Sequence, residues 1–492
     1  MPFVDVQFGD FLPDLDGMPN PAVPGYLVDA LNVRPVPYGY KPMPTPTDIA
    51  SVTDPDGSAT SSKLSYITAS SGTMEIFVTV QISASYKCYQ SNDVAQTWSE
   101  ITDSGGLITT NSQWVEYRQQ IIVAANGAIL EKSTTDAVST DLAALSGSPP
   151  AASRVGVVRD HVVLGFLSGT DWNAIQWCAI GDPTDWPTPG SADAASKQAG
   201  KLYLPSELGY VLAIVGGEKF GLIFQDSGIT RMTYVGGSAV YEFDTFERQN
   251  GLGHGDVNAR PVIVDDIAYW QNKNGIFGTD GYRVRKLSTG SVQNALFNAE
   301  SGMPSSDGLQ GVSGRYFSYF KSHDLIFFAH NGASSRPTLC YNPQTQKFCT
   351  YSNADFTWPI SFPETALLET SHIYTLPADR LLQRMNAENT SINIQTGFIE
   401  IDPGYYVEIE GVYILGTGTP GSLDIAYLAA TSYASMSATQ SGFTSMSAPD
   451  RGLKYRARVS APFFAFRITG VGNRDQLLRG LRIYYKRLEP IQ

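Results

Sequence analysis

A short unit of polar turn, apolar strand and second turn recurs between about residues 60 and 360. The turn and strand are visible at residues 118–125, 159–166, 217–224, 265–270 and 323–328. The second turns contain Gly72, Gly127, Gly169, Gly228, Gly275 and Gly332, roughly 40 to 60 residues apart and several in the Asn-Gly pairs of tight hairpins. Such a period, with about four strands per repeat, is typical of β-propeller blades. The sequence therefore predicts an irregular all-β propeller of about six blades, within one, and a β-sandwich with long hairpins is the alternative.

The composition agrees with many short strands. Only 16% of the 492 residues are charged, whereas 46 Gly, 29 Pro, 26 Tyr and 23 Phe supply turn formers and residues that favour strands. The first residues lack a basic segment followed by an apolar run, so we expect no secretory signal. No run approaches ~20 apolar residues, so we expect no membrane insertion.

Three domains are expected. Residues 1–50 contain nine prolines after residue 12 and predict an extended N-terminal arm without a helix. Residues 51–365 would form the propeller. Residues 366–492 would form a C-terminal β-rich, sandwich-like domain with basic terminal strands, interrupted by a Ser/Met-rich loop at 431–449 that we expect to be exposed.

The charge of the chain is unevenly distributed. Residues 451–492 hold ten Lys or Arg against two acidic residues, which gives +8, so the remainder carries −21 of the overall −13. An acidic body with a basic end suits head-to-tail contacts between copies, whereas a solvated basic sheet face explains the same pattern equally well. The candidate contacts to other subunits or partners are Arg451, Lys454, Arg456, Arg458, Arg482, Lys486 and Arg487.

No arrangement of residues points to catalysis, a cofactor or a metal. The five histidines lack metal-ligand spacing, and residues 251–256 resemble a phosphate loop only superficially, because no Lys-Ser/Thr follows. Cys88, Cys178, Cys340 and Cys349 are scattered, so buried free thiols are expected. Residues 91–98 are similar to the Asp-box hairpin of sialidase-type propellers, with Ala95 replacing the usual glycine. That hairpin supports blades but not an active site.

Three stretches together resemble one family, the tail hub or nozzle proteins of short-tailed bacteriophages, also described as packaged-DNA-stabilisation proteins. They are residues 11–14, 30–35 and 39–42 of the arm, residues 173–177 and 181–186, and residues 220–224 and 231–234 continuing through 251–255 to 267–270 and 275–277. The C-terminal runs 466–470 and 480–483 look like a common phage tail ending. Together these stretches cover about half of the chain.

The resemblance implies a non-enzymatic, structural virion protein, made in the host bacterial cytoplasm and located in the tail. Its copies would form a ring, expected to be a homohexamer, that extends the channel below the portal and its adaptor protein. The ring would help to retain packaged DNA, support DNA ejection and carry tail fibres or spikes. Double-stranded DNA would pass without sequence-specific binding, and an acidic channel wall would let it slide. The alternative function is a carbohydrate-active propeller, such as a tailspike or sialidase-like glycan depolymerase, which would need paired carboxylates in the central funnel.

Overall fold

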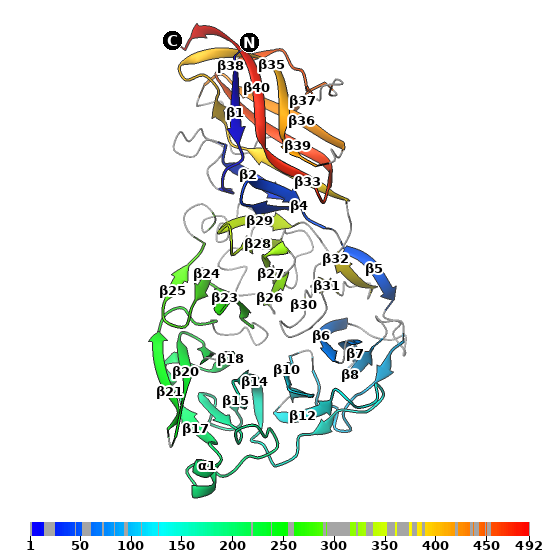
Figure 1. Ribbon diagram of the computed structural model, residues 1–492, viewed down its shortest axis with the longest axis vertical. Helices are drawn as coiled ribbons and strands as arrows, with labels where there is room; N and C mark the ends of the chain where they lie inside the picture. Colours follow the sequence, from blue (N-terminus) through cyan, green and yellow to red (C-terminus); the bar gives the residue numbers. More distant parts are fainter. Residues whose placement is uncertain are drawn as a thin grey trace.

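A computed structural model describes the fold of most of the chain. The described residues are 2–13, 25–44, 46–51, 61–70, 73–82, 84–92, 97–109, 111–125, 127–217, 220–237, 239–253, 260–288, 292, 315–320, 323–330, 338–351, 360–361, 373–375, 381–385, 389–418, 422–432, 436, 442–447, 449 and 454–491. They form an irregular β-propeller with a β-sandwich beside one edge of it, at one end of the long axis of the molecule (Figure 1). The predicted fold class is confirmed.

Within the described residues, the propeller consists of seven antiparallel units of four strands each, arranged around a centre (Figure 1). Blade one contains β6 (Ser61–Ser70), β7 (Thr73–Ile82), β8 (Ser85–Ser91) and β9 (Ser99–Glu100), and blade two contains β10 (Gln113–Tyr117), β11 (Gln120–Ala125), β12 (Ala128–Ser133) and β13 (Ala143–Ala144). Blade three contains β14 (Ala152–Val158), β15 (His161–Leu167), β16 (Ala174–Trp177) and β17 (Gly200–Tyr203), and blade four contains β18 (Val211–Gly216), β19 (Phe220–Gln225), β20 (Ile229–Gly236) and β21 (Val240–Glu247).

The next two blades follow the same order. Blade five contains β22 (Val262–Val264), β23 (Ile267–Asn272), β24 (Gly275–Thr279) and β25 (Val284–Lys286), and blade six contains β26 (Arg315–Phe320), β27 (Leu325–His330), β28 (Thr338–Asn342) and β29 (Lys347–Tyr351). The two helical elements bounded in the described ranges are α1 (Ala192–Ser196) and the 3-10 turn η1 (Ser206–Leu208), both near the outer strand of blade three. Val292 and His323 are also helical. The side chain of Ser191 caps α1 by accepting a hydrogen bond from the amide of Ala194.

The seventh blade closes the ring with a strand from the N-terminal arm. Its strands are β30 (Ile360–Ser361), β31 (Ile373–Thr375), β32 (Leu381–Met385) and β5 (Pro46–Ser51). β32 pairs antiparallel with β5, although more than 300 residues separate them in the sequence. Counting glycine turns predicts six blades because none of those glycines belongs to this blade.

Apolar side chains between neighbouring blades form the propeller core. One cluster joins blades three and four through Val163, Ile175, Ile214 and Ile223, all nearly inaccessible to solvent. Similar clusters join blades one and two, two and three, and four and five. The two sheets approach so closely at Gly216 that an added Cβ would lie 2.0 Å from the carbonyl oxygen of Val157. Buried strands with apolar side chains on both faces explain the short apolar runs in the sequence.

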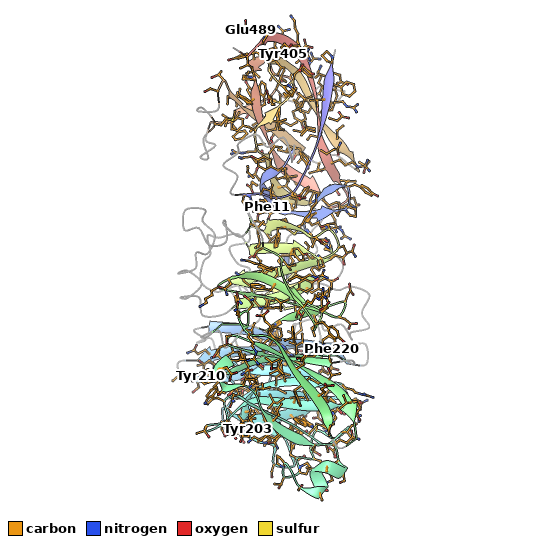
Figure 2. The ribbon with its side chains drawn as sticks, turned by 90° about the vertical axis from the view of Figure 1, so that its left-hand side faces the viewer. Phe11, Tyr203, Tyr210, Phe220, Tyr405 and Glu489 are labelled. Atoms are coloured by element: carbon orange, nitrogen blue, oxygen red, sulfur yellow. The ribbon has the colours of Figure 1, made fainter. Side chains whose placement is uncertain are left out.

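The sandwich is built from both ends of the chain. Its first sheet contains β1 (Phe3–Gln7), β3 (Val33–Val36), β4 (Gly39–Pro42), β35 (Tyr405–Thr417), β38 (Val459–Ala461) and β40 (Leu477–Pro490). Its second sheet contains β2 (Leu27–Leu31), β33 (Asn389–Thr396), β34 (Ile399–Glu400), β36 (Ser422–Ala430), β37 (Thr444–Ser445) and β39 (Phe463–Asn473). Figure 2 shows Tyr405 and Glu489 at the tip of the sandwich, Phe11 near the junction and Tyr203 in the propeller.

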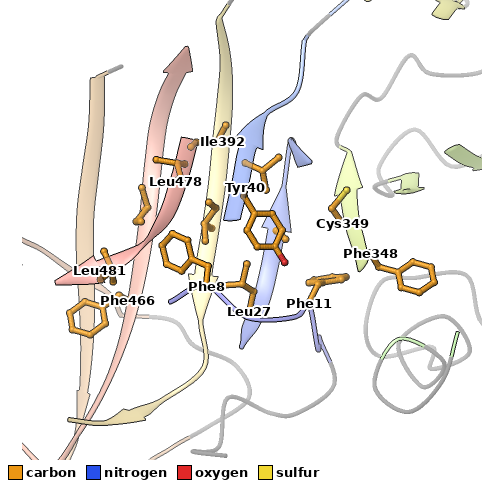
Figure 3. Close-up of a cluster of buried hydrophobic side chains, with 14 of the residues drawn as sticks. Phe8, Phe11, Leu27, Tyr40, Phe348, Cys349, Ile392, Phe466, Leu478 and Leu481 are labelled. Carbon is orange, nitrogen blue, oxygen red and sulfur yellow. The ribbon is translucent and has the colours of Figure 1, made fainter. Parts of the chain in front are cut away.

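β2 makes the propeller and the sandwich parts of one sheet. It pairs in parallel with β29 of blade six at Leu31 and Thr350, and antiparallel with β33 of the sandwich, which gives a continuous ten-stranded sheet. One buried cluster spans the same junction (Figure 3). In it, Leu481 and Phe466 of the sandwich pack with Leu27 and Tyr40 of the N-terminal strands and with Phe348 of blade six.

The expected domain limits differ in detail from the sheets observed. Residues expected to form an extended arm contribute β1 to β4 to the junction and the sandwich, and β5 to the propeller. The boundary expected at residue 365 falls inside blade seven, because β31 and β32 complete that blade. Prolines make a chain extended, but they do not indicate which sheet edge will accept it. Of the 19 positions of the Ser/Met-rich loop, nine lie outside the described residues. Most of the described positions are exposed, as expected, but the side chains of Met436 and Met446 are buried.

Candidate functional site: the basic face of the C-terminal sandwich

Strand β40 carries several of the cations that the sequence singled out. It runs through the middle of its sheet, with β35 on one side and β1 and β4 on the other. Leu481 and Ile483 are fully buried in the sandwich core. Because side chains alternate along a strand, Arg482 and Tyr484 lie on the opposite, outer face.

Arg482 is held by a partner from the other end of the chain. Its Nε and Nη2 donate to the two carboxylate oxygens of Asp5, each at 2.7 Å, and Asp5 is its cross-strand neighbour on β1. This bidentate pair lowers the pKa of Asp5 below its ordinary value and raises that of Arg482. The guanidinium also lies over the Phe3 ring, 4.6 Å from its centre.

Aromatic rings extend this site across the sheet. The rings of Phe3 and Tyr484 lie 5.6 Å apart, and Tyr413 of β35 packs edge-on against Tyr484 at 5.5 Å. The Lys454 ammonium lies 5.3 Å from the centre of the Tyr484 ring. We call this set, Phe3, Tyr413, Lys454, Arg482 and Tyr484, the aromatic–cation face. Phe3 is 51% exposed, so part of the face is open to solvent.

Arg487 has a second internal partner. Its Nε and Nη2 donate to the carboxylate of Asp402 at 2.6 and 2.8 Å, and its guanidinium lies 4.4 Å from the centre of the Tyr405 ring. The side chain of Asp402 is only 9% exposed. Hydrogen bonds from Arg487 to this carboxylate raise the pKa of the guanidinium. Arg482, which is half-buried, and Arg487, which is exposed, therefore both hold segments of the sandwich together.

The remaining candidates divide by exposure. Arg456, Arg458 and Lys486 are exposed, and the ion pairs found among the described residues include neither Arg458 nor Lys486. Arg451 lies outside the described residues.

Arg479 is also exposed on β40, but it is not among the candidates predicted from the sequence. A register shift in β35–β40 pairing at residues 415 and 416 leaves Arg479 without a β35 partner, and no sequence pattern signals this bulge.

Side chains cross the middle of the propeller. Arg260, which precedes β22, donates from Nη1 to the carbonyl oxygen of Trp114 in blade two at 2.5 Å. Gln113 of the same blade donates to the carbonyl oxygen of Leu212 in blade four at 3.4 Å. These bonds link blades that are not neighbours in the ring, so they stabilise the arrangement of the inner strands.

A buried histidine lies between blades three and four. The Nδ1 atom of His161 is 2.7 Å from the Tyr241 hydroxyl, and its Nε2 atom is 3.2 Å from the carbonyl oxygen of Gln198. Trp177 Nε1 donates to that same carbonyl at 3.0 Å, and Tyr234 donates to the Gln198 side chain at 2.6 Å. Burial lowers the pKa of His161 to about 4. This network holds the loop after α1 against blade four.

Other expectations have plain structural outcomes. The four cysteines are buried and none is in a disulfide, as the sequence predicted. Within the described part of the chain, no group of three or more His, Cys, Asp or Glu is placed to hold a metal ion. None of the helices in these ranges is long and apolar enough to cross a bilayer. Four positions of the Asp-box-like hairpin, 93–96, lie outside the described residues, as do residues 254–259.

Comparisons with known proteins give little further information. No protein-family model and no curated protein matches the sequence. Similar solved structures include the tricorn protease, with 11% identity, a TM-score of 0.26 and coverage of 65% of this chain. This chain spans only 35% of that protease chain.

Two further solved structures show a similar degree of likeness. Apo AztD from Citrobacter koseri has 9% identity and a TM-score of 0.31, over 59% of this chain and 72% of its own. The N-terminal domain of Nup159 has 11% identity and a TM-score of 0.36, over 72% of this chain and 97% of its own.

Proposed function

We propose that this protein is a structural subunit of a short-tailed bacteriophage tail, in which copies form a ring that extends the DNA channel of the portal and adaptor. The observation that carries the proposal is the continuous sheet through β2, which joins the propeller to the sandwich by main-chain pairing. A subunit of a pressurised channel must keep its shape under load. Main-chain pairing and a shared buried core resist bending better than a flexible linker does.

The stretches that resemble the tail hub family occupy structural positions. Residues 30–35 and 39–42 belong to β2, β3, β4 and the turns beside them, at the junction of the two bodies. Residues 181–186 form a turn after β16, in which Asp182 accepts hydrogen bonds from the amide and hydroxyl of Thr184 and Trp186 donates to the carbonyl oxygen of Pro183. These residues shape the subunit, which agrees with a structural role for the whole chain.

The distribution of charge supports contacts between copies. Arg456, Arg458 and Lys486 present exposed positive charge on the sandwich, whereas residues outside 451–492 carry a net charge of −21. In the proposed ring, this positive surface meets an acidic surface of the adaptor, a fibre or another copy. An acidic channel wall would pass duplex DNA without holding it.

The test is the size and shape of the purified full-length protein. We expect sedimentation velocity to show a closed oligomer, consistent with a hexamer, and negative-stain images to show rings with a pore wider than a DNA duplex. Replacing Arg456, Arg458 and Lys486 together by Glu should weaken this assembly, whereas Lys273→Glu, at an exposed turn of blade five, should not. A protein that stays monomeric at high concentration, or that cleaves bacterial surface glycans, would contradict the proposal.

A further inference from the structure

A cavity of about 360 Å³ lies where the propeller meets the sandwich. The β3–β4 hairpin and the start of β40 form one side, and the turns after β26 and β28 of blade six form the other. Val36, Tyr38 and Leu477 provide apolar wall, and Arg34, Lys41 and Thr345 provide polar groups. Its volume is within the range of small-molecule binding pockets.

Arg34 is a half-buried cation whose Nε lacks a hydrogen-bond partner among the described residues. Its Nε is buried and makes no hydrogen bond in the described part of the structure, and its guanidinium forms none of the ion pairs found there. Burial lowers the pKa of Arg34. The nearby carboxylate of Asp324 accepts a hydrogen bond from the Tyr319 hydroxyl at 3.0 Å and forms no ion pair with Arg34. A buried donor of this kind gains from an added acceptor.

A second donor in the wall also lacks a partner. The Thr345 hydroxyl is buried and makes no hydrogen bond among the described residues, although the amide of Thr345 donates to the side chain of Asn342 at 2.9 Å. That amide bond fixes the main chain of the turn that carries the hydroxyl. Lys41 also lines the cavity and takes part in none of the ion pairs that the described residues form. Two donors around this space, the Nε of Arg34 and the hydroxyl of Thr345, therefore lack an acceptor within the described ranges.

The charges and walls restrict the ligand. Arg34 and Lys41 against Asp324 give the lining a net charge of about +1, which suits a singly charged anion better than a phosphate dianion. A carboxylate can bind a guanidinium through two parallel hydrogen bonds. The apolar wall calls for a hydrocarbon portion beside that carboxylate.

We propose that this cavity binds a monocarboxylate that carries a small apolar body, either a free acid or the carboxyl end of a polypeptide. The carboxylate accepts hydrogen bonds from Arg34 and Thr345, with Lys41 adding charge, and the apolar body packs against Val36 and Leu477. The inference concerns a small-molecule site and goes beyond the proposed ring. It stands or falls independently of the ring, because its test does not depend on the oligomeric state.

The test uses ligand-observed saturation-transfer NMR with the full-length protein and 4-methylpentanoate. We expect a clear saturation-transfer signal from the methyl groups of 4-methylpentanoate. The signal from its uncharged isostere, 4-methylpentanamide, should be at least fivefold smaller. Arg34→Met should reduce the acid signal at least fivefold, and Thr345→Val should reduce it measurably. Arg474→Met is the matched control, because Arg474 is exposed and close enough to affect the pKa of Arg34 but does not line the cavity.

The controls make the result decisive. Circular dichroism must first show that each variant folds like the parent, and Thr345→Val keeps the test valid if Arg34→Met does not fold. Equal signals from the acid and the amide, or unchanged acid signals from both variants, would overturn the proposal. Loss of the acid signal on adding an equal concentration of inorganic phosphate would overturn it as well. N-acetylleucine distinguishes a free acid from the carboxyl end of a polypeptide. If N-acetylleucine binds more tightly than 4-methylpentanoate, the ligand is a polypeptide end, and if it binds more weakly, the ligand is a free acid.

Discussion

The buried His161 network makes the stability of the protein depend on pH in a defined range. Neutral His161 can donate from Nε2 to the carbonyl oxygen of Gln198 and accept at Nδ1 from the Tyr241 hydroxyl. Protonation need not break these contacts, since the Tyr241 hydroxyl can turn to the carbonyl oxygen of Val158, 3.1 Å away. The cost is the burial of a positive charge in a side chain that solvent does not reach.

The magnitude follows from the two pKa values. The pKa of His161 falls from 6.5 to about 4 on folding, so the unfolded chain binds the proton more readily. Its contribution is complete above about pH 6.5 and is lost as the pH falls toward 4. With about 1.4 kcal/mol per pKa unit, the loss is about 2 kcal/mol at pH 5 and at most about 3 kcal/mol below pH 4.

The assay compares the parent protein with His161→Gln, which cannot titrate there. Urea unfolding is followed by tryptophan fluorescence between pH 8 and pH 4, since Trp177 lies in the network. Glu75, whose burial raises its pKa to about 7, changes stability in the opposite direction over this range. Subtracting the free energy of unfolding of the variant from that of the parent at each pH removes the contribution of Glu75, which both proteins share. The parent should lose about 2 kcal/mol more than the variant between pH 8 and pH 5, and a constant difference would refute the reasoning.

Three further predictions concern packing, ion pairing and thiols. Gly216→Ala should destabilise the protein by about 1–3 kcal/mol because the new methyl group meets a backbone carbonyl, whereas Gly217→Ala, with open space around it, should cost less than about 1 kcal/mol in urea unfolding. Arg487→Met should lower the urea midpoint by leaving Asp402 unpaired, and the exposed neighbour Lys486→Met should not; equal midpoints for the two variants would count against the structural role. A thiol reagent should label the four buried cysteines slowly in the native protein and rapidly in urea, and rapid native labelling would show that they are accessible.

Much of the fold follows from local sequence patterns. The recurring turn and apolar strand indicate hairpins, and their spacing indicates blades, because each turn and strand forms from neighbouring residues. The hairpin at Asp265 and Asp266 is an example: both residues have positive φ, as a tight two-residue turn between β22 and β23 requires. The scattered cysteines also gave the correct expectation of buried free thiols.

The candidate site could be predicted only in part from the sequence. Counting charges finds an excess of cations at the C-terminal end, but it cannot show which of them are paired. Arg482 meets Asp5 from 477 positions away, and Arg487 meets Asp402 from 85 positions away. Charge counting therefore did not distinguish the paired cations from the exposed ones, and it gave no sign that the Nε of Arg34 would lack a hydrogen-bond partner among the described residues.

The sequence by itself determined that the chain forms short strands, where most of them turn and which side chains seek burial. Those properties depend on residues a few positions apart. The tertiary structure alone decided that β5 closes a seventh blade, that β2 joins the propeller to the sandwich, and that the N-terminal strands flank β40. The physical reason is that a sheet edge offers unpaired main-chain groups to any extended segment, and only the complete fold determines which segment reaches it.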